Sequence, residues 1–582
     1  MMRWILLSCL LSVSVTISRG ADPTTGDAEQ LYLSTIKPLL ARGCQACHGA
    51  LAQEAGLRLD TAAAIQRGGD SGPAVVAGDH TQSLLISRVT DPAPATRMPP
   101  EGEGEALSAA EIASIAAWID AGCPAPIDEQ PEADPRDHWA FSPRIRPAIP
   151  APDDSDASTT RHPIDLFVGE RLSAAGLTPQ PEAAREVLVR RVYLDLIGMP
   201  PSPEELSAIS TATAPDWYDA LVEQLLADPR YGQRWARHWM DIWRYSDWWG
   251  LGDQLRNSQK HMWHFRDWIV EALNDNVGYD EMVRMMLAAD ELAPDDLDSL
   301  RATGFLARNW FLFNRTPWMD DTVEHVGKAL LGLTTNCAKC HDHKYDPISH
   351  EDYYRLRAFF EPLHVRMDMV PGEQNLDADG IPRVFDALLE APTYRFIRGN
   401  DAQPDTSQPL QPGVPAILGF APLSIEPVPL PKSAVEPARR SWVLENAVAD
   451  AQATVRAAEA AGNEQALAIA KAQLTAVEQR VEASRAAWAV EDAPTADTAE
   501  LHVAATTAAQ AAVKAEREVA RLLAWGNMTA INEKLAAATS KQDAGAIGEL
   551  EKELTAAREK IDQATAAVGE PGEDFTRFVG AR

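Results

Sequence analysis

The sequence predicts a mainly α-helical protein: a small N-terminal domain, a larger all-helical domain, and a third region of long helices. Helical periodicity recurs over seven segments between residues 165 and 288. Ser108 followed by Glu111 forms a capping-box signature before an apolar stripe. Beyond residue 439 the chain becomes rich in Ala, Glu and Lys with heptad spacing. With 582 residues, the chain exceeds what one hydrophobic core serves, so several domains are expected.

Composition and charge restrict the partners that this chain can have. Hydrophobic residues make up 45% and charged residues 24%, which is typical of globular protein. The formal net charge of -32 argues against binding nucleic acid or anionic lipid. The same charge is consistent with a basic partner or with a solvated acidic surface.

The first residues have the pattern of an export signal, expected at 1–20. Arg3 precedes an apolar run from Ile5 to Ile17, and small residues precede Ala21. Cys9 lies too early in that run for lipoprotein cleavage. No later segment approaches the roughly 20 apolar residues that a membrane-spanning helix needs. The protein is therefore expected to be exported, to the periplasm or outside the cell, without a membrane span.

The first domain is expected at 27–123. An amphipathic helix at 28–42 leads directly into Cys44, and a second helix is expected at 109–121. The stretch from Thr61 to Pro100, rich in Gly, Pro and Asp, is expected to be loop. A helix, a cysteine motif, loops and a final helix follow the order of a small cytochrome c domain.

The motif itself is C-x-x-C-H, found at Cys44–His48 and again at Cys337–His341. Two thiols one helical turn apart can each bond a vinyl group of one porphyrin, and the adjoining histidine then binds the iron. The sequence therefore predicts two covalent haem c groups. Cys44 and Cys47 hold the first with His48 as ligand; Cys337 and Cys340 hold the second with His341. This leaves Cys123 as a small buried or loop residue.

A sixth ligand is expected for the first iron. Met98 lies in an Arg-Met-Pro-Pro loop where a methionine has little core role, so it is the predicted ligand, with His80 as the competitor. For the second iron the predicted distal ligand is His325, on the helix before the motif. An open position, or His238, His264 or Met319, are the alternatives.

His343 is too close in sequence to His341 to reach the opposite face of the ring. It is expected to bind a propionate or to orient Asp342 and Asp346. If the second iron has two histidine ligands, its potential lies below that of a His/Met first haem. Electrons would then flow from the second haem to the first.

A Pro-rich linker is expected at 124–163, with an aromatic docking point at Asp137–Phe141. The helical domain follows at 164–362. Trp235, Trp239 and Trp243 recur every four residues in it, which indicates core packing or a wall for the second haem. Helices are expected at 165–175, 183–196, 203–209, 217–227, 233–245, 264–274, 279–288, 320–333 and 353–360.

Three strings in this domain carry a family resemblance: Arg190–Gly198, Pro229–Trp239 and Phe265–Trp268. With the run from Cys337 to Ile348, they resemble the modular planctomycete cytochrome proteins. In that family a planctomycete-type cytochrome c domain precedes the domain of unknown function 1549. The resemblance implies an exported haem protein rather than a named enzyme. The usual third C-terminal domain is not recognisable here, which implies a shortened member or a fragment.

The remaining chain is expected to form a turn- and Pro-rich connector at 363–437, coiled-coil helices at 438–566 and a tail at 567–582. Breaks at Gly462-Asn463 and at 492–494 predict antiparallel helices folding back, as a spacer or as a means of self-association. A solvated helical hairpin is the alternative. The heptad positions are Leu467, Ala470, Leu474, Val477, Val481, Ser484 and Trp488, then Ile547, Leu550, Leu554, Ala557 and Ile561.

Three functions are compatible with these features. The first is electron transfer by a dihaem cytochrome, with a redox partner that the sequence does not identify. The second is a dihaem, peroxidase-like redox enzyme with one open iron. The third is a polysaccharide-associated structural module with only one haem, in which Cys337, Cys340, His341 and His343 grip zinc. The third is disfavoured because no second remote ligand pair follows.

Overall fold

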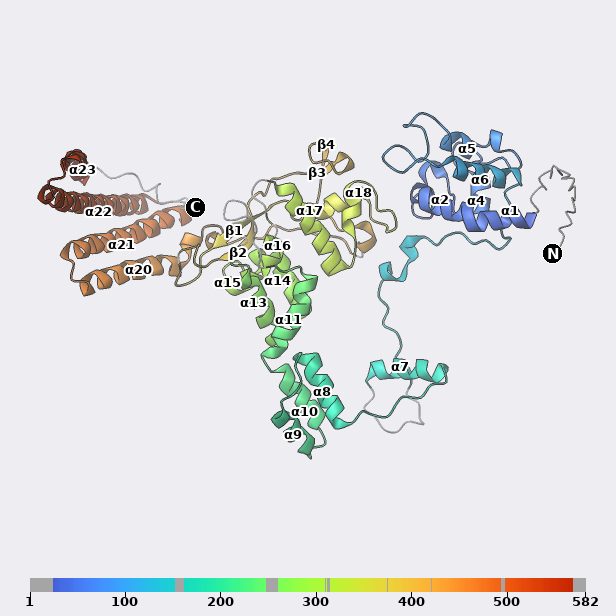
Figure 1. The fold of residues 1–582 in the computed structure, drawn as a ribbon, viewed down its shortest axis with the longest axis horizontal. Coiled ribbons are helices and arrows are strands. Elements are labelled where there is room, and N and C mark those ends of the chain that lie inside the picture. The colour runs from blue at the N-terminus through green and yellow to red at the C-terminus, as the bar shows by residue number, and fades with distance from the viewer. Residues whose placement is uncertain are drawn as a thin grey trace, which may run out of the picture. The chain divides into compact units, whose positions relative to one another are not determined.

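The computed structural model describes residues 25–568, except 152–161, 247–259, 309, 311–313, 374, 420 and 494–497. The expected export signal and Cys9 lie outside the described residues. The chain is mainly helical, as predicted (Figure 1). In the described part, no helix is both long enough and apolar enough to cross a bilayer.

The chain divides into two compact units, each assembled from separate stretches. The first comprises Met1–Ala175, Thr335–Leu356 and Thr393–Leu423. The second comprises Gly176–Thr334, Arg357–Pro392 and Ser424–Arg582. The two C-x-x-C-H motifs, nearly 300 residues apart, therefore belong to the same unit.

The first unit begins with one helical stretch interrupted by a π-turn. Helix α1 (Thr25–Leu31) continues through the π segment Tyr32–Ile36 into α2 (Lys37–Gly43). Pro38 explains the interruption, because proline has no N–H to donate and its ring clashes with the carbonyl group four residues earlier. The predicted helix at 28–42 is present with this local change.

The region from Thr61 to Pro100 is not the continuous loop expected from its composition. It contains α4 (Ala62–Arg67), a 3-10 turn at His80–Gln82 and α5 (Leu84–Val89). Thr61 caps α4 by accepting a hydrogen bond from the Ala64 N–H. Both helices are too short to show helical periodicity, and burial of Ile65 and Leu85 holds them in place.

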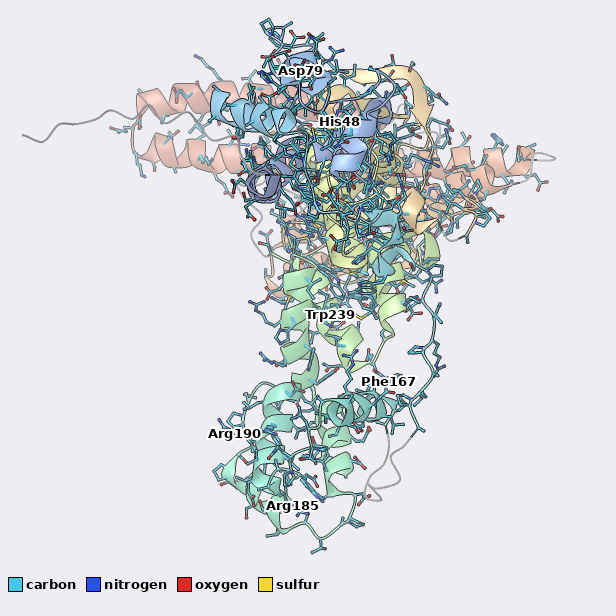
Figure 2. The ribbon with its side chains drawn as sticks, turned by 90° about the vertical axis from the view of Figure 1, so that its right-hand side faces the viewer. His48, Asp79, Phe167, Arg185, Arg190 and Trp239 are labelled. Carbon is cyan, nitrogen blue, oxygen red and sulfur yellow. The ribbon has the colours of Figure 1, made fainter. Side chains whose placement is uncertain are left out.

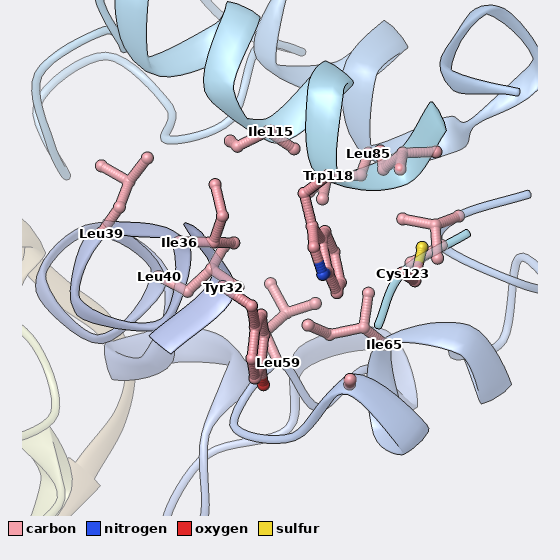
Figure 3. Close-up of a cluster of buried hydrophobic side chains, with 14 of the residues drawn as sticks. Tyr32, Ile36, Leu39, Leu40, Leu59, Ile65, Leu85, Ile115, Trp118 and Cys123 are labelled. Atoms are coloured by element: carbon pink, nitrogen blue, oxygen red, sulfur yellow. The ribbon is translucent and has the colours of Figure 1, made fainter. Parts of the chain in front are cut away.

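Residues 25–123 of the first unit form an N-terminal module. Its core lies between α1–α2 and α6 (Ala109–Asp120), as Figure 3 shows. Tyr32 stacks on Trp118 with ring centroids 5.1 Å apart, and the Trp118 indole donates to the Pro124 carbonyl. The predicted capping box of Ser108 and Glu111 is present. Cys123 is buried in this core, as expected.

Residues 129–136 are bound to the module, although the sequence placed them in a linker. The Glu129 carboxylate accepts hydrogen bonds from the Tyr32 hydroxyl (2.8 Å), the Lys37 ammonium (2.6 Å) and the Ala62 N–H (2.9 Å). Farther on, Trp139 is 80% exposed and begins the second of two short 3-10 turns, Pro135–Asp137 and Trp139–Phe141. The docking role of this aromatic segment stays a prediction.

The first unit also holds α7 (Pro163–Ala174), a 3-10 turn at Thr335–Lys339 and most of α18 (His350–Arg357). Strands β3 (Thr393–Phe396) and β4 (Pro404–Leu410) pair antiparallel in it.

The second unit contains the helices of the larger domain. Seven correspond to predicted segments: α8 (Arg185–Leu196), α9 (Pro203–Thr211), α10 (Trp217–Leu226), α11 (Arg230–Ile242), α13 (Trp263–Asn274), α14 (Tyr279–Leu292) and α17 (Arg315–Val326). Short α15 (Leu297–Leu300) and α16 (Gly304–Ala307) were not predicted.

A β-hairpin that the sequence did not predict follows α18. Strands β1 (Leu363–Asp368) and β2 (Ile381–Asp386) pair antiparallel, with Val365 opposite Val384. The Asp368 carboxylate is buried between the Arg366 and Arg383 guanidinium groups, each 2.7 Å away. Arg366 and Arg383 also donate to the Ala434 carbonyl, so they attach the hairpin to α19 (Lys432–Val435).

Four long helices complete the second unit: α20 (Ser441–Ala460), α21 (Glu464–Asp492), α22 (Ala499–Ser540) and α23 (Ala544–Val568). They pack in sequence order, as Figure 1 shows. The interruption after Ala460 agrees with the predicted break at Gly462-Asn463. Alanines form most of the contact between α21 and α22, while Ile531 and Leu554 join α22 to α23. Knobs-into-holes packing and self-association stay predictions.

Candidate functional site

The first C-x-x-C-H motif forms a single tight turn at the end of α2. The Cys44 carbonyl accepts hydrogen bonds from the N–H groups of Cys47 (3.2 Å) and His48 (2.9 Å). The short helix α3 (Gln45–His48) thus carries Cys47 and His48 directly beyond Cys44 (Figure 2 labels His48). This local geometry brings both thiols and the imidazole onto one turn, as covalent haem attachment requires.

His48 has the properties of an available ligand. Its Nδ1 atom is buried and has no hydrogen-bond partner. Burial lowers the pKa of the imidazole, although the backbone around Glu54 and Leu57 favours the charged form. The ring is therefore neutral at neutral pH, and neutral imidazole is the form that binds a metal.

The thiols of the first motif are not set up as free nucleophiles. Burial, followed by the neighbouring Cys47, raises the pKa of Cys44 to about 11. Burial and then Glu103 also raise the pKa of Cys47. Reactive cysteines have lowered pKa values, so these raised values do not indicate a catalytic thiolate at either position.

A cavity of about 990 Å³ adjoins this motif within the first unit. Leu39, Leu51 and Leu107 give it apolar walls, and Arg42 and Arg355 supply positive charge. Cys47 lines it, and so does His341 of the second motif. The volume is within the range of cofactor pockets. The lining is more polar than in most such pockets, because carboxylates such as Glu103, Asp346 and Asp352 also face the cavity. The leucine side chains, the two arginines, Cys47 and His341 fit a haem.

The two candidates for the sixth ligand of the first iron differ in their surroundings. The His80 Nδ1 lies 2.8 Å from the Asp120 carboxylate, so a hydrogen bond at the surface occupies that nitrogen. The Met98 side chain is 37% exposed, and its backbone N–H donates to the Arg88 carbonyl. Pro99, next to Met98, lines the cavity. Met98 as ligand stays a prediction.

The second motif lies on an exposed turn. Cys337 and Cys340 are both exposed, and the His341 Nδ1 lies 2.6 Å from the Asp342 carbonyl oxygen. Gly399 packs directly on Cys340: a Cβ atom there would lie only 2.4 Å from the Cys340 Sγ. With its φ of +72°, Gly399 allows an approach that no other residue would permit.

Two further histidines surround the second motif. His343 is buried, and its Nδ1 accepts hydrogen bonds from the N–H groups of Tyr345 (3.3 Å) and Asp346 (2.8 Å), so it holds the turn after the motif. Sequence reasoning did not consider His350. Its ring contacts Tyr354, and its Nε2 is buried without a partner. The only sequence signal for His350 is its position nine residues beyond His341.

The predicted distal ligand, His325, and its alternatives belong to the second unit. His325 is 4% exposed, with Nδ1 3.0 Å from the Arg244 guanidinium and Nε2 unpartnered. The His264 Nε2 lies 2.7 Å from the Asp379 carboxylate. Met319 is fully buried and His238 is exposed. His325 as an iron ligand stays a prediction.

The tryptophan stripe of α11 also belongs to the second unit. Trp243 is fully buried, and Trp239 stacks on Trp243 at 4.9 Å and on Tyr279 at 5.2 Å (Figure 2 labels Trp239). These contacts agree with core packing, one of the two roles expected from the sequence.

Over the described ranges, no group of three or more His, Cys, Asp or Glu side chains is arranged to hold a metal ion. Cys337, Cys340, His341 and His343 are therefore not gathered as a zinc site would need. No observation favours the zinc alternative.

Comparison with known families agrees with this geometry. A family model described as Planctomycete cytochrome C matches residues 44–102. A second, described as Protein of unknown function (DUF1549), matches residues 163–365. The chain carries a planctomycete cytochrome c module followed by a DUF1549 module. This confirms the resemblance inferred from the sequence strings and makes the chain a c-type cytochrome-like haem protein. No curated protein and no solved structure matches the chain.

Proposed function

We propose that this planctomycete-type cytochrome is an exported dihaem protein that transfers electrons. Cys44 and Cys47 attach the first haem, and Cys337 and Cys340 attach the second. His48 and His341 are the proximal ligands, and Met98 is the sixth ligand of the first iron. The observation that carries the proposal is the cavity of the first unit, which both Cys47 and His341 line.

Haem supplies reversible one-electron chemistry at its iron. The chain holds and orients the group. At the first motif, burial keeps His48 neutral, and the Cys44 carbonyl fixes both Cys47 and His48 on one turn. Apolar side chains such as Leu39 and Leu107 would exclude water from the porphyrin face, while Arg42 and Arg355 would pair with propionates.

At the second motif, the contact of His341 Nδ1 with the Asp342 carbonyl leaves Nε2 as the nitrogen available to iron. A histidine ligand commonly donates its other N–H to a carbonyl group, which orients the ring. Because both motifs line one cavity of the first unit, residues of both would contact haem bound there, and the groups would supply one-electron chemistry at neighbouring positions.

The decisive experiment counts covalent haem in protein matured in a host that assembles c-type cytochromes. Pyridine haemochrome spectra and haem-stained gels should give two haems per chain. The Cys44→Ala/Cys47→Ala and Cys337→Ala/Cys340→Ala variants should each lose one. Cys123→Ala is the matched control, since Cys123 belongs to neither motif, and it should keep two.

A single haem that survives the Cys337→Ala/Cys340→Ala change would disprove the dihaem proposal. Peroxide turnover by the two-haem protein, with a high-spin signal from one iron, would instead support the enzymatic alternative.

A further inference from the structure

His325 presents an unusual hydrogen-bonding problem. It lies on α17 with only 4% of its surface exposed. Its Nδ1 lies 3.0 Å from the Arg244 guanidinium, which can only donate. Nδ1 must therefore accept, so the proton of the neutral ring is on Nε2. That Nε2–H is buried and has no acceptor among the residues that the structure describes, and an unsatisfied buried donor opposes folding.

A second buried cation is bound to Arg244. Arg308, at the end of α16, is 7% exposed and donates to the carbonyl oxygens of Phe305 (3.1 Å) and Arg244 (3.2 Å). Burial, followed by the charge of Arg244, lowers the pKa of Arg308 to about 10. Burial, followed by the charges of Arg308 and Arg244, lowers the pKa of His325 to about 3. Two guanidinium groups thus act on a neutral histidine, and one of them is in contact with it.

The charges of the described residues that face this group do not cancel. Burial raises the pKa of Asp321, and this effect outweighs the charges of Arg308 and Arg244, which lower it. Glu324 forms an ion pair with Lys328, whose charge also lowers the pKa of His325. In the described part of the chain, neither Arg244 nor Arg308 forms an ion pair with a carboxylate. One carboxylate against two guanidinium groups leaves an excess positive charge in a protein that is otherwise strongly acidic.

Arg244 contacts both buried residues, His325 and Arg308, and is itself exposed to solvent. Its side chain is exposed, and its backbone has a φ of 56°, which is unfavourable for a residue other than glycine. In this conformation its carbonyl accepts from Arg308 while its guanidinium reaches His325. Strained backbone is retained mainly where surrounding contacts or function require it.

We propose that Arg244, Arg308 and His325 form a binding site for the oxygen atoms of a small oxyanion. An oxyanion would accept the unpaired Nε2–H and balance the excess positive charge. This site lies wholly within the DUF1549 module and does not depend on the proposed dihaem function. It gives His325 a role as donor, whereas an iron ligand would need the Nε2 lone pair.

The test is isothermal titration of the full-length, haem-loaded protein with inorganic phosphate and, separately, with acetate, in buffer of low chloride content. One probe should bind with a stoichiometry of one per chain. Arg244→Gln and His325→Gln should each weaken that binding at least tenfold. Arg237→Gln is the matched control, because this exposed α11 arginine pairs with Asp241 and not with His325; it should bind as the parent does.

Absence of binding by both probes, or binding that Arg244→Gln and His325→Gln leave unchanged, would overturn the proposal. If His325→Gln does not fold, the exposed Arg244→Gln still tests it. The haem absorption spectrum gives an independent readout. Under the proposal it is the same in His325→Gln as in the parent, whereas loss of a low-spin ligand band would show that His325 binds iron instead.

Discussion

At the residue scale, the buried carboxylates differ in whether they have cationic partners. Asp60 is bound by the Arg58 guanidinium at 2.8 and 2.9 Å and by the Glu132 N–H at 2.8 Å. Asp290 is 3% exposed, has no cationic partner over the described ranges of the chain, and its Oδ2 makes no hydrogen bond there. Burial, followed by the nearby Asp386 and Glu291 carboxylates, raises the pKa of Asp290 to about 7.

The raised pKa of Asp290 predicts a pH-dependent stability. The folded state holds the proton more tightly than the unfolded state, whose pKa is 3.8. The stabilisation from Asp290 is therefore complete below about pH 4 and is lost as the pH rises toward 7. Asp290→Asn removes this loss, so it should stabilise the protein at pH 8 by up to about 4 kcal/mol and have little effect at pH 4.

Thermal unfolding of Asp290→Asn at both pH values checks this expectation. Asp275→Asn serves as control, because Asp275 is exposed at the end of α13. An Asp290→Asn variant that is less stable than the parent at pH 8 would show that the carboxylate has a cationic partner.

At the scale of single elements, capping residues at helix ends contribute to the free energy of unfolding. In α6 the Ser108 hydroxyl accepts from the Glu111 N–H, and the Glu111 carboxylate accepts from the Ser108 N–H. This helix supplies Trp118 and Ile115 to the core of the cytochrome module. Fraying of its first turn would therefore loosen the core beside the first motif.

Ser108→Ala removes one acceptor of this capping box and should cost about 1 kcal/mol of unfolding free energy. Urea unfolding, followed through the fluorescence of the module, measures it. Ser114→Ala is the matched control: Ser114 lies within the same helix and only donates to the Ala110 carbonyl. Equal losses in the two variants would contradict a capping role.

The hairpin of β1 and β2 depends on a buried ion cluster. The Asp368 carboxylate is fully buried, with Arg383 and Arg366 at 2.7 Å and Arg440 at 3.3 Å. Since Arg440 immediately precedes α20, this cluster joins the hairpin to the long helices.

Removing Asp368 would leave three guanidinium groups facing one another in a buried site. Asp368→Ala should therefore cost about 3–5 kcal/mol of unfolding free energy. Asp405→Ala, which breaks the exposed pair with Arg395 in the other hairpin, should cost under about 1 kcal/mol. Chemical denaturation of both variants measures the two losses of unfolding free energy. Similar losses would show that burial does not strengthen the dependence on the carboxylate.

At the scale of the whole molecule, the formal charge of -32 dominates long-range electrostatics. A field of this sign attracts cations and repels anions, and salt screens it over about 10 Å at 0.1 M. Any electron-transfer partner with a basic surface would therefore associate faster at low ionic strength.

This predicts opposite salt effects on electron transfer with small mediators. Stopped-flow reduction by hexaammineruthenium(II), a cation, should slow about tenfold as salt rises from low to high concentration. Reduction by an anionic reductant, ascorbate, should become faster. The comparison within each mediator removes the difference in driving force. Salt effects of the same sign for both mediators would show that the net charge does not govern access to the haem groups.

The sequence by itself determined the features that depend on neighbouring residues. Both C-x-x-C-H motifs, the Ser108 capping box, most helices and the break after Ala460 follow from spacing over a few positions, because helix geometry and covalent attachment are local. It did not reveal α4 and α5, which are too short for periodicity, or the β1–β2 hairpin, whose strands are each six residues long.

Only the tertiary structure decided which polar groups meet across long distances in the chain. It placed Glu129 against Lys37, Asp379 against His264, and Arg244 against His325, and it gathered both cysteine motifs into one unit. The physical reason is that a buried charge or N–H must find a partner wherever folding leaves one, and no local pattern records which residue that will be. His325 shows the difference: its sequence position suggested an iron ligand, whereas the oxyanion site that we propose for it rests on neighbours that only the tertiary structure supplies.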